Sequence, residues 1–329
     1  MSITEPSATK PTVVLVHGAF AESSSWSGVI TGLLNEGYPA VAVANPLRGV
    51  TFDSDYLRDT LADITGDIVL VGHSYGGTVI SGGGAGNPNV KALVFVGAFA
   101  PEAGETPGEL AAKLPGSSLG DTLTQVKLAD GGVDLYIRQD QYHAQFAADS
   151  PAAVADVMGV TQRPIRESAF GEASGEPAWK TVPSWFLFGA LDKNIPAATH
   201  RFMAERAGSR KTVELAGGSH TVGIPEAAKV IQHAASSIPG RDIVQVLTEI
   251  PVDVSSGWHH HPGEEVGYIV AGRVRMERED GETQTLNAGD GFLIPPGVPH
   301  NATDLGPATG QMLSTYIVES GRPVATLGR

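Results

Sequence analysis

The chain has 329 residues, no cysteine and a formal net charge of −14. Its length allows two domains, and the lack of cysteine excludes disulfides and thiol chemistry. The acidic balance disfavours a nucleic-acid partner, and no apolar run approaches the length of a membrane span. Because the segment from Met1 to Lys10 also lacks the pattern of a secretory signal, we expect a cytoplasmic protein that binds neither nucleic acid nor membranes.

The first predicted element is a buried strand over residues 12–16, which ends in the loop His17-Gly18-Ala19. Gly18 would allow the backbone to approach a reacting group closely. The backbone N–H of Ala19 would then be one donor of an oxyanion hole. We expect the ring of His17 to bind nearby backbone rather than to react.

The next buried strand, residues 68–71, runs directly into Gly72-His73-Ser74-Tyr75-Gly76-Gly77 and a predicted helix. A sharp strand-to-helix turn of this kind holds a serine hydroxyl out at the edge of a sheet and tolerates only very small residues on either side. We therefore interpret Ser74 as a nucleophile and the N–H of Tyr75 as the second oxyanion donor. The structural alternative is a helix N-cap role for Ser74.

A further strand, residues 92–96, precedes a segment of about 80 residues, 101–180, that is too long for a plain crossover. Helix-like stretches occur at residues 106–114 and 151–158. Several aromatic residues and a histidine could line a substrate pocket or form a small core of the segment's own: Tyr136, Tyr142, His143, Phe146 and Phe170.

Two later strands end in loops that carry candidate partners for the serine. Asp192 follows the strand at residues 185–188, and His220 lies in a glycine-rich loop after residues 211–215. In this order Asp192 would orient His220, which would take the proton of Ser74. Taken singly, Asp192 could be a turn residue and His220 a surface residue; Glu102 is the alternative acid.

Residues 11–237 resemble an α/β-hydrolase of the esterase and hydroxynitrile-lyase-like branch, on the elbow, on His17-Gly18-Ala19 and on the helix start around Trp26. The resemblance implies a doubly wound, mostly parallel α/β sheet, a helical cap at about 101–180, a final helix near 225–237 and no cofactor. Hydroxynitrile lyases of this branch typically carry Lys after the catalytic His, where this chain has Thr221. That difference favours ester hydrolysis.

Residues 236–240 are predicted to be a linker, and the sequence beyond them alternates with period two. Strands are expected at residues 243–250, 266–276, 291–294 and 311–318, which indicates an all-β barrel or sandwich. His259 and His261 would share one face of a strand. Together with Glu265 and His300 they form a set of side chains suited to a first-row divalent metal.

This second part resembles a cupin, because His259, His261, Glu265 and Gly272 fit one motif of that family and Gly289, Pro295, Gly297 and His300 fit the other. The resemblance implies a cupin barrel whose metal ligands are His259, His261, Glu265 and His300. The ion would be manganese, iron, zinc or nickel. The cupin could be catalytic, or it could be a sensor or structural module.

We therefore predict a hydrolase domain at residues 1–238 and a cupin domain at residues 239–329. The expected activity is hydrolysis of a small carboxylic ester by Ser74, His220 and Asp192, and we expect a homodimer formed through the cupin. The alternatives are a lyase or carbon–carbon hydrolase on the same triad, and a small-molecule receptor or sensor.

Overall fold

A computed structural model describes residues 10–150, 152–221, 228–250, 252, 255–322 and 324–327. The chain divides into two compact units: Met1–Ala148 with Ala152–Ile224, and Asp149–Pro151 with Pro225–Arg329. Within the described ranges, no helix has both the length and the apolar character needed to cross a membrane.

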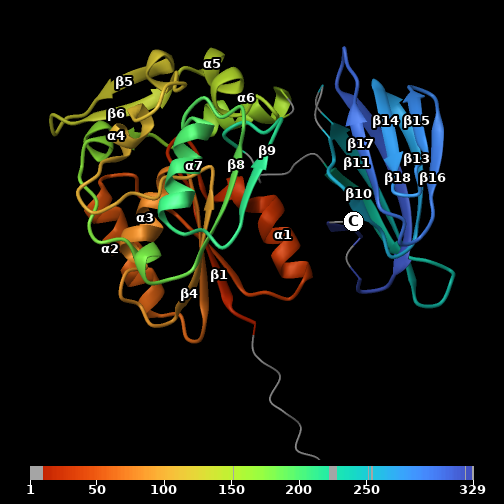
Figure 1. The fold of residues 1–329 in the computed structure, drawn as a ribbon, viewed down its shortest axis with the longest axis horizontal. Helices are drawn as coiled ribbons and strands as arrows, with labels where there is room; N and C mark the ends of the chain where they lie inside the picture. The colour runs from red at the N-terminus through yellow and green to blue at the C-terminus, as the bar shows by residue number, and fades with distance from the viewer. Residues whose placement is uncertain are drawn as a thin grey trace, which may run out of the picture. The chain divides into compact units, whose positions relative to one another are not determined.

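A six-stranded sheet forms the centre of the first unit, and all of its neighbouring strands are parallel (Figure 1). Its strand order is β2-β1-β3-β4-β8-β9. Because parallel strands share one direction, their carboxyl ends meet at one edge of the sheet, where the candidate catalytic loops begin. The strands are β1 (Thr12–Val16), β2 (Ala40–Val43), β3 (Ile68–His73), β4 (Val90–Val96), β8 (Ser184–Gly189) and β9 (Thr212–Leu215).

Both faces of this sheet are buried. Along β1, Val13 and Leu15 belong to one apolar cluster, whereas Val14 and Val16 belong to the other. Helices cover the two faces, which confirms the predicted doubly wound α/β fold. The helices are α1 (Ser27–Asn35), α2 (Val50–Ala62), α3 (Tyr75–Gly83) and α7 (Ala197–Arg206), with short 3-10 helices at Ser23–Trp26 and Ala178–Lys180.

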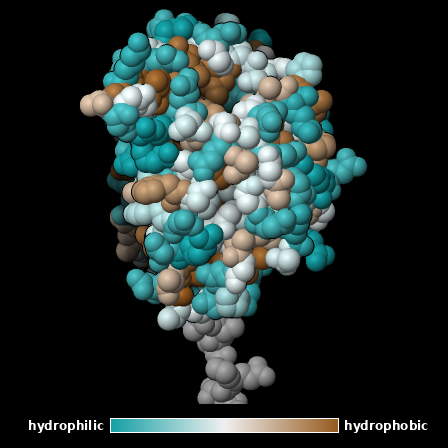
Figure 2. Space-filling view, turned by 90° about the vertical axis from the view of Figure 1, so that its left-hand side faces the viewer, coloured by the Kyte–Doolittle hydropathy of each residue, from teal (hydrophilic) through white to brown (hydrophobic). Residues whose placement is uncertain are grey.

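The segment between β4 and β8 forms the expected cap, but the cap is not purely helical. It contains a three-stranded antiparallel sheet, β5-β6-β7, in addition to helices near both predicted positions. Figure 2 shows hydrophobic side chains gathered at the end of the molecule that the cap forms in Figure 1. The cap elements are α4 (Pro107–Ala112), β5 (Leu123–Lys127), β6 (Val133–Ile137), α5 (Gln139–Phe146), α6 (Ala152–Thr161) and β7 (Ile165–Arg166), with 3-10 helices at Leu119–Thr122 and Glu167–Phe170.

The second unit is all β, as predicted, and consists of two five-stranded antiparallel sheets in the orders β10-β11-β18-β13-β16 and β15-β14-β17-β12-β19. Ile269, Val274 and Met312 are buried in its core. The expected strand 266–276 is interrupted at Gly272, whose φ is +79°. The strands are β10 (Ala228–Ala235), β11 (Arg241–Ile250), β12 (His259–His260), β13 (Glu264–Ala271), β14 (Arg273–Arg278), β15 (Thr283–Asn287), β16 (Gly291–Ile294), β17 (His300–Asp304), β18 (Gly310–Glu319) and β19 (Thr326–Leu327).

The predicted final helix near residues 225–237 and the linker at 236–240 were wrong. Residues 228–235 are strand β10, which pairs with β11 in an antiparallel hairpin. The supposed linker is the turn of that hairpin, where the Ser236 N–H donates to the Arg241 carbonyl at 2.9 Å. Pairing with β11 satisfies the backbone of this segment and overrides its local preference. Residues 225–227 lie outside the described part of the chain.

Candidate active site and metal centre

The turn from β3 into α3 places Ser74 in a conformation that few side chains adopt, with φ +54° and ψ −124°. The neighbouring backbone is crowded. A Cβ at Gly76 would lie 2.3 Å from the Val16 carbonyl oxygen, and one at Gly18 would lie 2.5 Å from Cβ of Ser74. Glycine is therefore required at both positions, and the loop after β1 runs directly beside Ser74.

The structure brings together Ser74, His220 and Asp192, the three predicted residues. Nε2 of His220 lies 2.8 Å from Oγ of Ser74, and Nδ1 of His220 lies 2.8 Å from Oδ2 of Asp192. All three residues are buried. They follow β3, β9 and β8 respectively, so the common direction of the parallel strands delivers them to one edge. The distances are short enough for proton transfer along the chain from serine to imidazole.

Asp192 accepts four hydrogen bonds. Its Oδ1 accepts the backbone N–H groups of Asn194 and Ile195 at 2.8 and 2.9 Å. Its Oδ2 accepts Nδ1 of His220 and also Nε2 of His200, the latter at 3.0 Å. Burial alone would raise the pKa of Asp192, but the nearby His220 and the hydrogen bonds of both histidines hold this pKa well below its usual range. The group is an oriented carboxylate at neutral pH.

Ala19 and Tyr75, the predicted oxyanion donors, are both buried. Tyr75 is the first residue of α3, so its N–H has no acceptor inside that helix. Ala19 follows Gly18, which contacts Ser74. The Tyr75 hydroxyl donates to the buried carboxylate of Asp53 at 2.9 Å, and this anchor of the turn was not predicted.

Two rings, one from a phenylalanine and one from a histidine, flank the imidazole of His220. Phe146 from the cap lies edge-on with its ring centroid 4.9 Å from that of His220. The ring of His73 is also 4.9 Å away, and its Nε2 donates to the His220 carbonyl at 2.9 Å. The Tyr142 hydroxyl donates to the Phe20 carbonyl at 2.7 Å, which ties the cap to the loop after β1. The imidazole is buried among these side chains.

Other predicted candidates lie elsewhere. Tyr136 lines a depression of about 590 Å³ in the cap, together with Val126 and Val160, and no residue of the triad lines it. Glu102, the alternative acid, forms an ion pair with Lys180. The ring of His17 donates through Nδ1 to the Gly18 carbonyl at 2.9 Å, as expected for a structural histidine.

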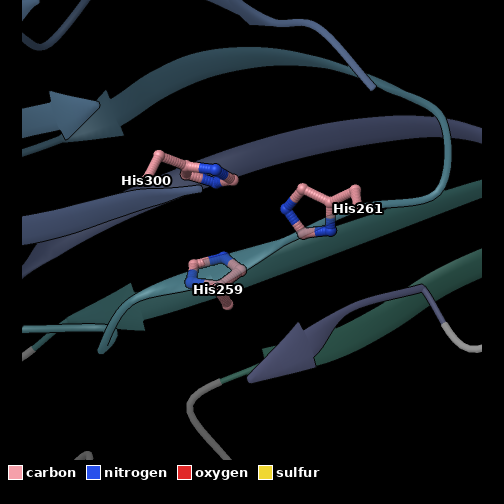
Figure 3. Close-up of side chains that lie close together, drawn as sticks. All are labelled: His259, His261 and His300. Carbon is pink, nitrogen blue, oxygen red and sulfur yellow. The ribbon is translucent and has the colours of Figure 1, made fainter. Parts of the chain in front are cut away.

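In the second unit, three histidine rings converge, as Figure 3 shows. Ligand atoms of His259, His261 and His300 all lie within 4.8 Å of one another. His259 on β12 is directly paired with His300 on β17. Oε2 of Glu265 lies 3.1 Å from Nε2 of both His261 and His300. All four predicted metal-binding residues therefore lie together.

The protonation of these rings suits a cation. Nδ1 of each histidine lies 2.7–3.0 Å from a backbone carbonyl, which can only accept, so each Nδ1 carries the proton. In the neutral rings, the Nε2 atoms of His261 and His300 therefore present lone pairs. Together with Oε2 of Glu265, these atoms are buried without a hydrogen-bond partner among the residues that the structure describes. Lone pairs that face one another repel unless a cation lies among them. The donor set fits a divalent transition metal.

Comparison with known proteins places the chain in a family. The profile of the alpha/beta hydrolase family matches residues 13–233. The chain belongs to the alpha/beta hydrolase family. A cupin-domain profile matches residues 246–316, so this alpha/beta hydrolase also carries a cupin domain. The hydrolase match includes part of β10, which the structure places in the second unit.

Two curated proteins are similar over part of this alpha/beta hydrolase. "Probable hydrolase R7" of Phoma sp. is 33% identical over 113 residues, which cover 30% of this chain and 46% of that protein. The "Carbendazim hydrolyzing esterase" of Nocardioides sp. is 34% identical over 107 residues, covering 28% and 44%. The matches thus span less than half of these relatives.

Among solved structures, that of polyneuridine aldehyde esterase superposes with a TM-score of 0.58 at 20% identity, covering 66% of this chain and 94% of that one. The likeness shows the fold.

Proposed function

We propose that this alpha/beta hydrolase cleaves a small carboxylic ester with Ser74 as nucleophile. The observation that carries the proposal is the continuous hydrogen-bonded chain from Ser74 through His220 to Asp192, with 2.8 Å at each step. The esterase among the similar proteins supports the class of bond. The strained elbow supports the nucleophile, because such strain is kept where the serine must be presented to a substrate.

In the proposed reaction, His220 removes the proton of Ser74 as Oγ attacks the ester carbonyl. The N–H groups of Ala19 and Tyr75 stabilise the oxyanion. The imidazolium, oriented and stabilised by Asp192, gives its proton to the departing alcohol and leaves an acyl ester on Ser74. A water activated by His220 then attacks this ester, releasing the carboxylic acid and restoring the serine.

The test is hydrolysis of a p-nitrophenyl ester by the Ser74→Ala variant. We expect kcat/KM to fall by about 10³-fold or more, because only binding and oxyanion stabilisation remain. Ser81→Ala is the matched control, since Ser81 also lies buried in α3 but donates to the Gly77 carbonyl. Turnover by Ser74→Ala within a few-fold of wild type would refute the nucleophile. Cyanide release from a cyanohydrin would reveal a lyase, and ester binding without turnover would reveal a receptor.

We also propose that His259, His261, Glu265 and His300 hold one divalent transition metal in the cupin. The support is the set of buried, inward-directed lone pairs. Such an ion would supply a Lewis acid, or only a structural tie between β12, β13 and β17. The residues themselves hold the site in shape, since the backbone carbonyls fix each ring and the Tyr316 hydroxyl donates to Oε1 of Glu265 at 3.1 Å.

Finally, we propose that two copies associate through the cupin, with β13 and β16 at the contact. Val266, Tyr268 and Val270 on β13 are 48, 49 and 43% exposed, and Leu293 beside Val266 is 56% exposed. In a chain of net charge −14, like charges oppose self-association, and these four uncharged side chains lack that repulsion. Light scattering tests it: we expect a dimer that Tyr268→Glu converts to a monomer, and a monomeric wild-type protein would refute it.

A further inference from the structure

One oxygen of the acid in the hydrolase site serves two imidazoles. Oδ2 of Asp192 lies 2.8 Å from Nδ1 of His220 and 3.0 Å from Nε2 of His200. Because the carboxylate is ionised, it can only accept, and so Nε2 of His200 carries a proton and donates it. The ester-cleaving scheme above assigns no part to His200.

His200 is buried, and its ring packs against a phenylalanine. It lies in the first turn of α7, its side chain is 1% exposed, and its ring stacks on Phe188 at 4.8 Å between centroids with planes 14° apart. Nδ1 of His200 is buried and has no hydrogen-bond partner in the described part of the chain. Nδ1 of the ring therefore makes no hydrogen bond within the described residues. The only hydrogen bond that the His200 side chain makes among them is the one from Nε2 to Asp192.

A second donor on Oδ2 changes what that oxygen offers to His220. Each N–H that binds a carboxylate stabilises its negative charge and lowers its proton affinity. The carboxylate then attracts the imidazolium form of His220 less strongly. Without the His200 donor, the imidazolium would be stabilised more, and His220 would remain protonated to a higher pH.

We propose that His200 is a positioning residue that holds Oδ2 of Asp192 and thereby sets the pH at which His220 becomes a free base. The proposal rests on the proposed function of the triad. It predicts that wild-type protein retains turnover at a lower pH than a variant that lacks the donor.

Several titratable groups surround this arrangement. His220 is faced by Asp192 from the loop after β8, by His200 from α7 and by His73 from the end of β3. His17 is near enough to His73 for its charge to affect His73. Glu214 on β9 is near enough to His200 for their charges to interact. Of these groups, only His200 donates to the same oxygen as His220. Substituting His200 therefore removes this one donor and leaves the other titratable groups in place.

Two variants separate the donor from the packing. His200→Phe keeps an aromatic ring over Phe188 and removes the N–H, whereas His200→Gln keeps an N–H donor of similar reach. We expect the acidic limb of kcat/KM for a p-nitrophenyl ester to move up by about one pH unit in His200→Phe. In His200→Gln it should stay near the wild-type position. If His200→Phe does not fold, His200→Leu replaces it.

A second readout does not need turnover. The titration of His220, followed by NMR through its Nδ1 proton in histidine-labelled protein, should show the same upward displacement in His200→Phe and not in His200→Gln. A purely structural role would lower stability or turnover in both variants and leave the titration of His220 in place, and that result would overturn the proposal. Wild-type protein without esterase activity would refute the proposed function, while the NMR titration would still decide the role of His200.

Discussion

Asp192 is the most constrained side chain of the hydrolase site, because four N–H donors occupy its two oxygens. Two of these donors belong to its own loop and hold the carboxylate in one orientation. The other two are imidazoles, so the charge of Asp192 acts on His220 through a fixed geometry. Its contribution to catalysis should therefore be the orientation and charge stabilisation of His220 rather than substrate binding.

Asp192→Asn tests this role of the carboxylate, because the substitution replaces one oxygen by an NH2 group. The amide keeps the shape but carries no charge and can turn an N–H toward Nδ1 of His220, which would force the wrong tautomer. We expect kcat to fall by about 10³- to 10⁴-fold with a much smaller change in KM. Steady-state kinetics on a chromogenic ester measures both. Unchanged kcat would mean that the acid comes from another residue.

Two other buried histidines affect stability. Burial lowers the pKa of His73 to about 3 and that of His17 to about 4. The unfolded chain binds these protons with a pKa of about 6.5. Since the folded pKa values are depressed, the stability from the neutral rings is fully present above about pH 6.5. This stability is lost as the pH falls toward 4, because the unfolded state then binds protons at these rings that the folded state does not bind.

We therefore expect the free energy of unfolding of the first unit to fall with acidification below about pH 6, by about 1.4 kcal/mol per pH unit for each of these rings. His73→Gln keeps a donor for the His220 carbonyl. It should reduce the dependence of the unfolding free energy on pH by about 1.4 kcal/mol per pH unit, whatever the stability of the variant at pH 8. Urea unfolding followed by tryptophan fluorescence at several pH values gives the slope. An equal slope in wild type and variant would show that His73 binds its proton as readily in the folded chain as in the unfolded chain.

At the scale of elements, the proposed metal centre depends on strands that are distant in sequence. His259 and His300 meet because β12 and β17 pair, and Glu265 is placed by β13 in the other sheet. The backbone carbonyls that fix the ring nitrogens belong to the surrounding turns, which makes the site rigid before any ion binds. If the proposed site binds an ion, a preformed geometry of this kind should bind it tightly and should lose affinity sharply when one ligand is removed.

His261→Ala should lower the metal content of purified protein by at least about tenfold. His260→Ala is the matched control, since His260 is the neighbouring residue on β12 but not one of the three clustered histidines. Elemental analysis after exposure to manganese, iron, nickel and zinc, and after dialysis, provides the measurement. Protein that stays free of metal under all four conditions would disprove the centre, and equal losses in both variants would disprove the ligand assignment.

At the scale of the whole molecule, the two sites are built by different units. Ser74, Asp192 and His220 belong to the first, and the histidine cluster belongs to the second. Stripping the metal with a chelator should therefore leave most of the ester hydrolysis in place. Activity and metal content measured on the same samples provide the test. A proportional fall of esterase activity with metal content would show that the cupin supports the hydrolase site.

Local patterns along the chain are sufficient to predict the features that depend on a few neighbouring residues. The glycines around Ser74, the order of Ser74, Asp192 and His220 at strand ends, and the spacing of the cupin histidines all reflect constraints within a few residues. The structure brings each of these sets together. Such motifs can be recognised in the sequence because backbone crowding and strand alternation directly restrict which residue types fit at each position.

Other elements and contacts form only because segments distant in sequence pair or pack in the folded chain. The strand β10 exists because β11 pairs with it, and the cap sheet exists because β6 can pair with both β5 and β7. His200 contacts Asp192 only because α7 packs beside β8, and no pattern in the sequence marks it. Long-range pairing and packing are set by the whole fold, so segments of weak local preference take the structure that their neighbours impose.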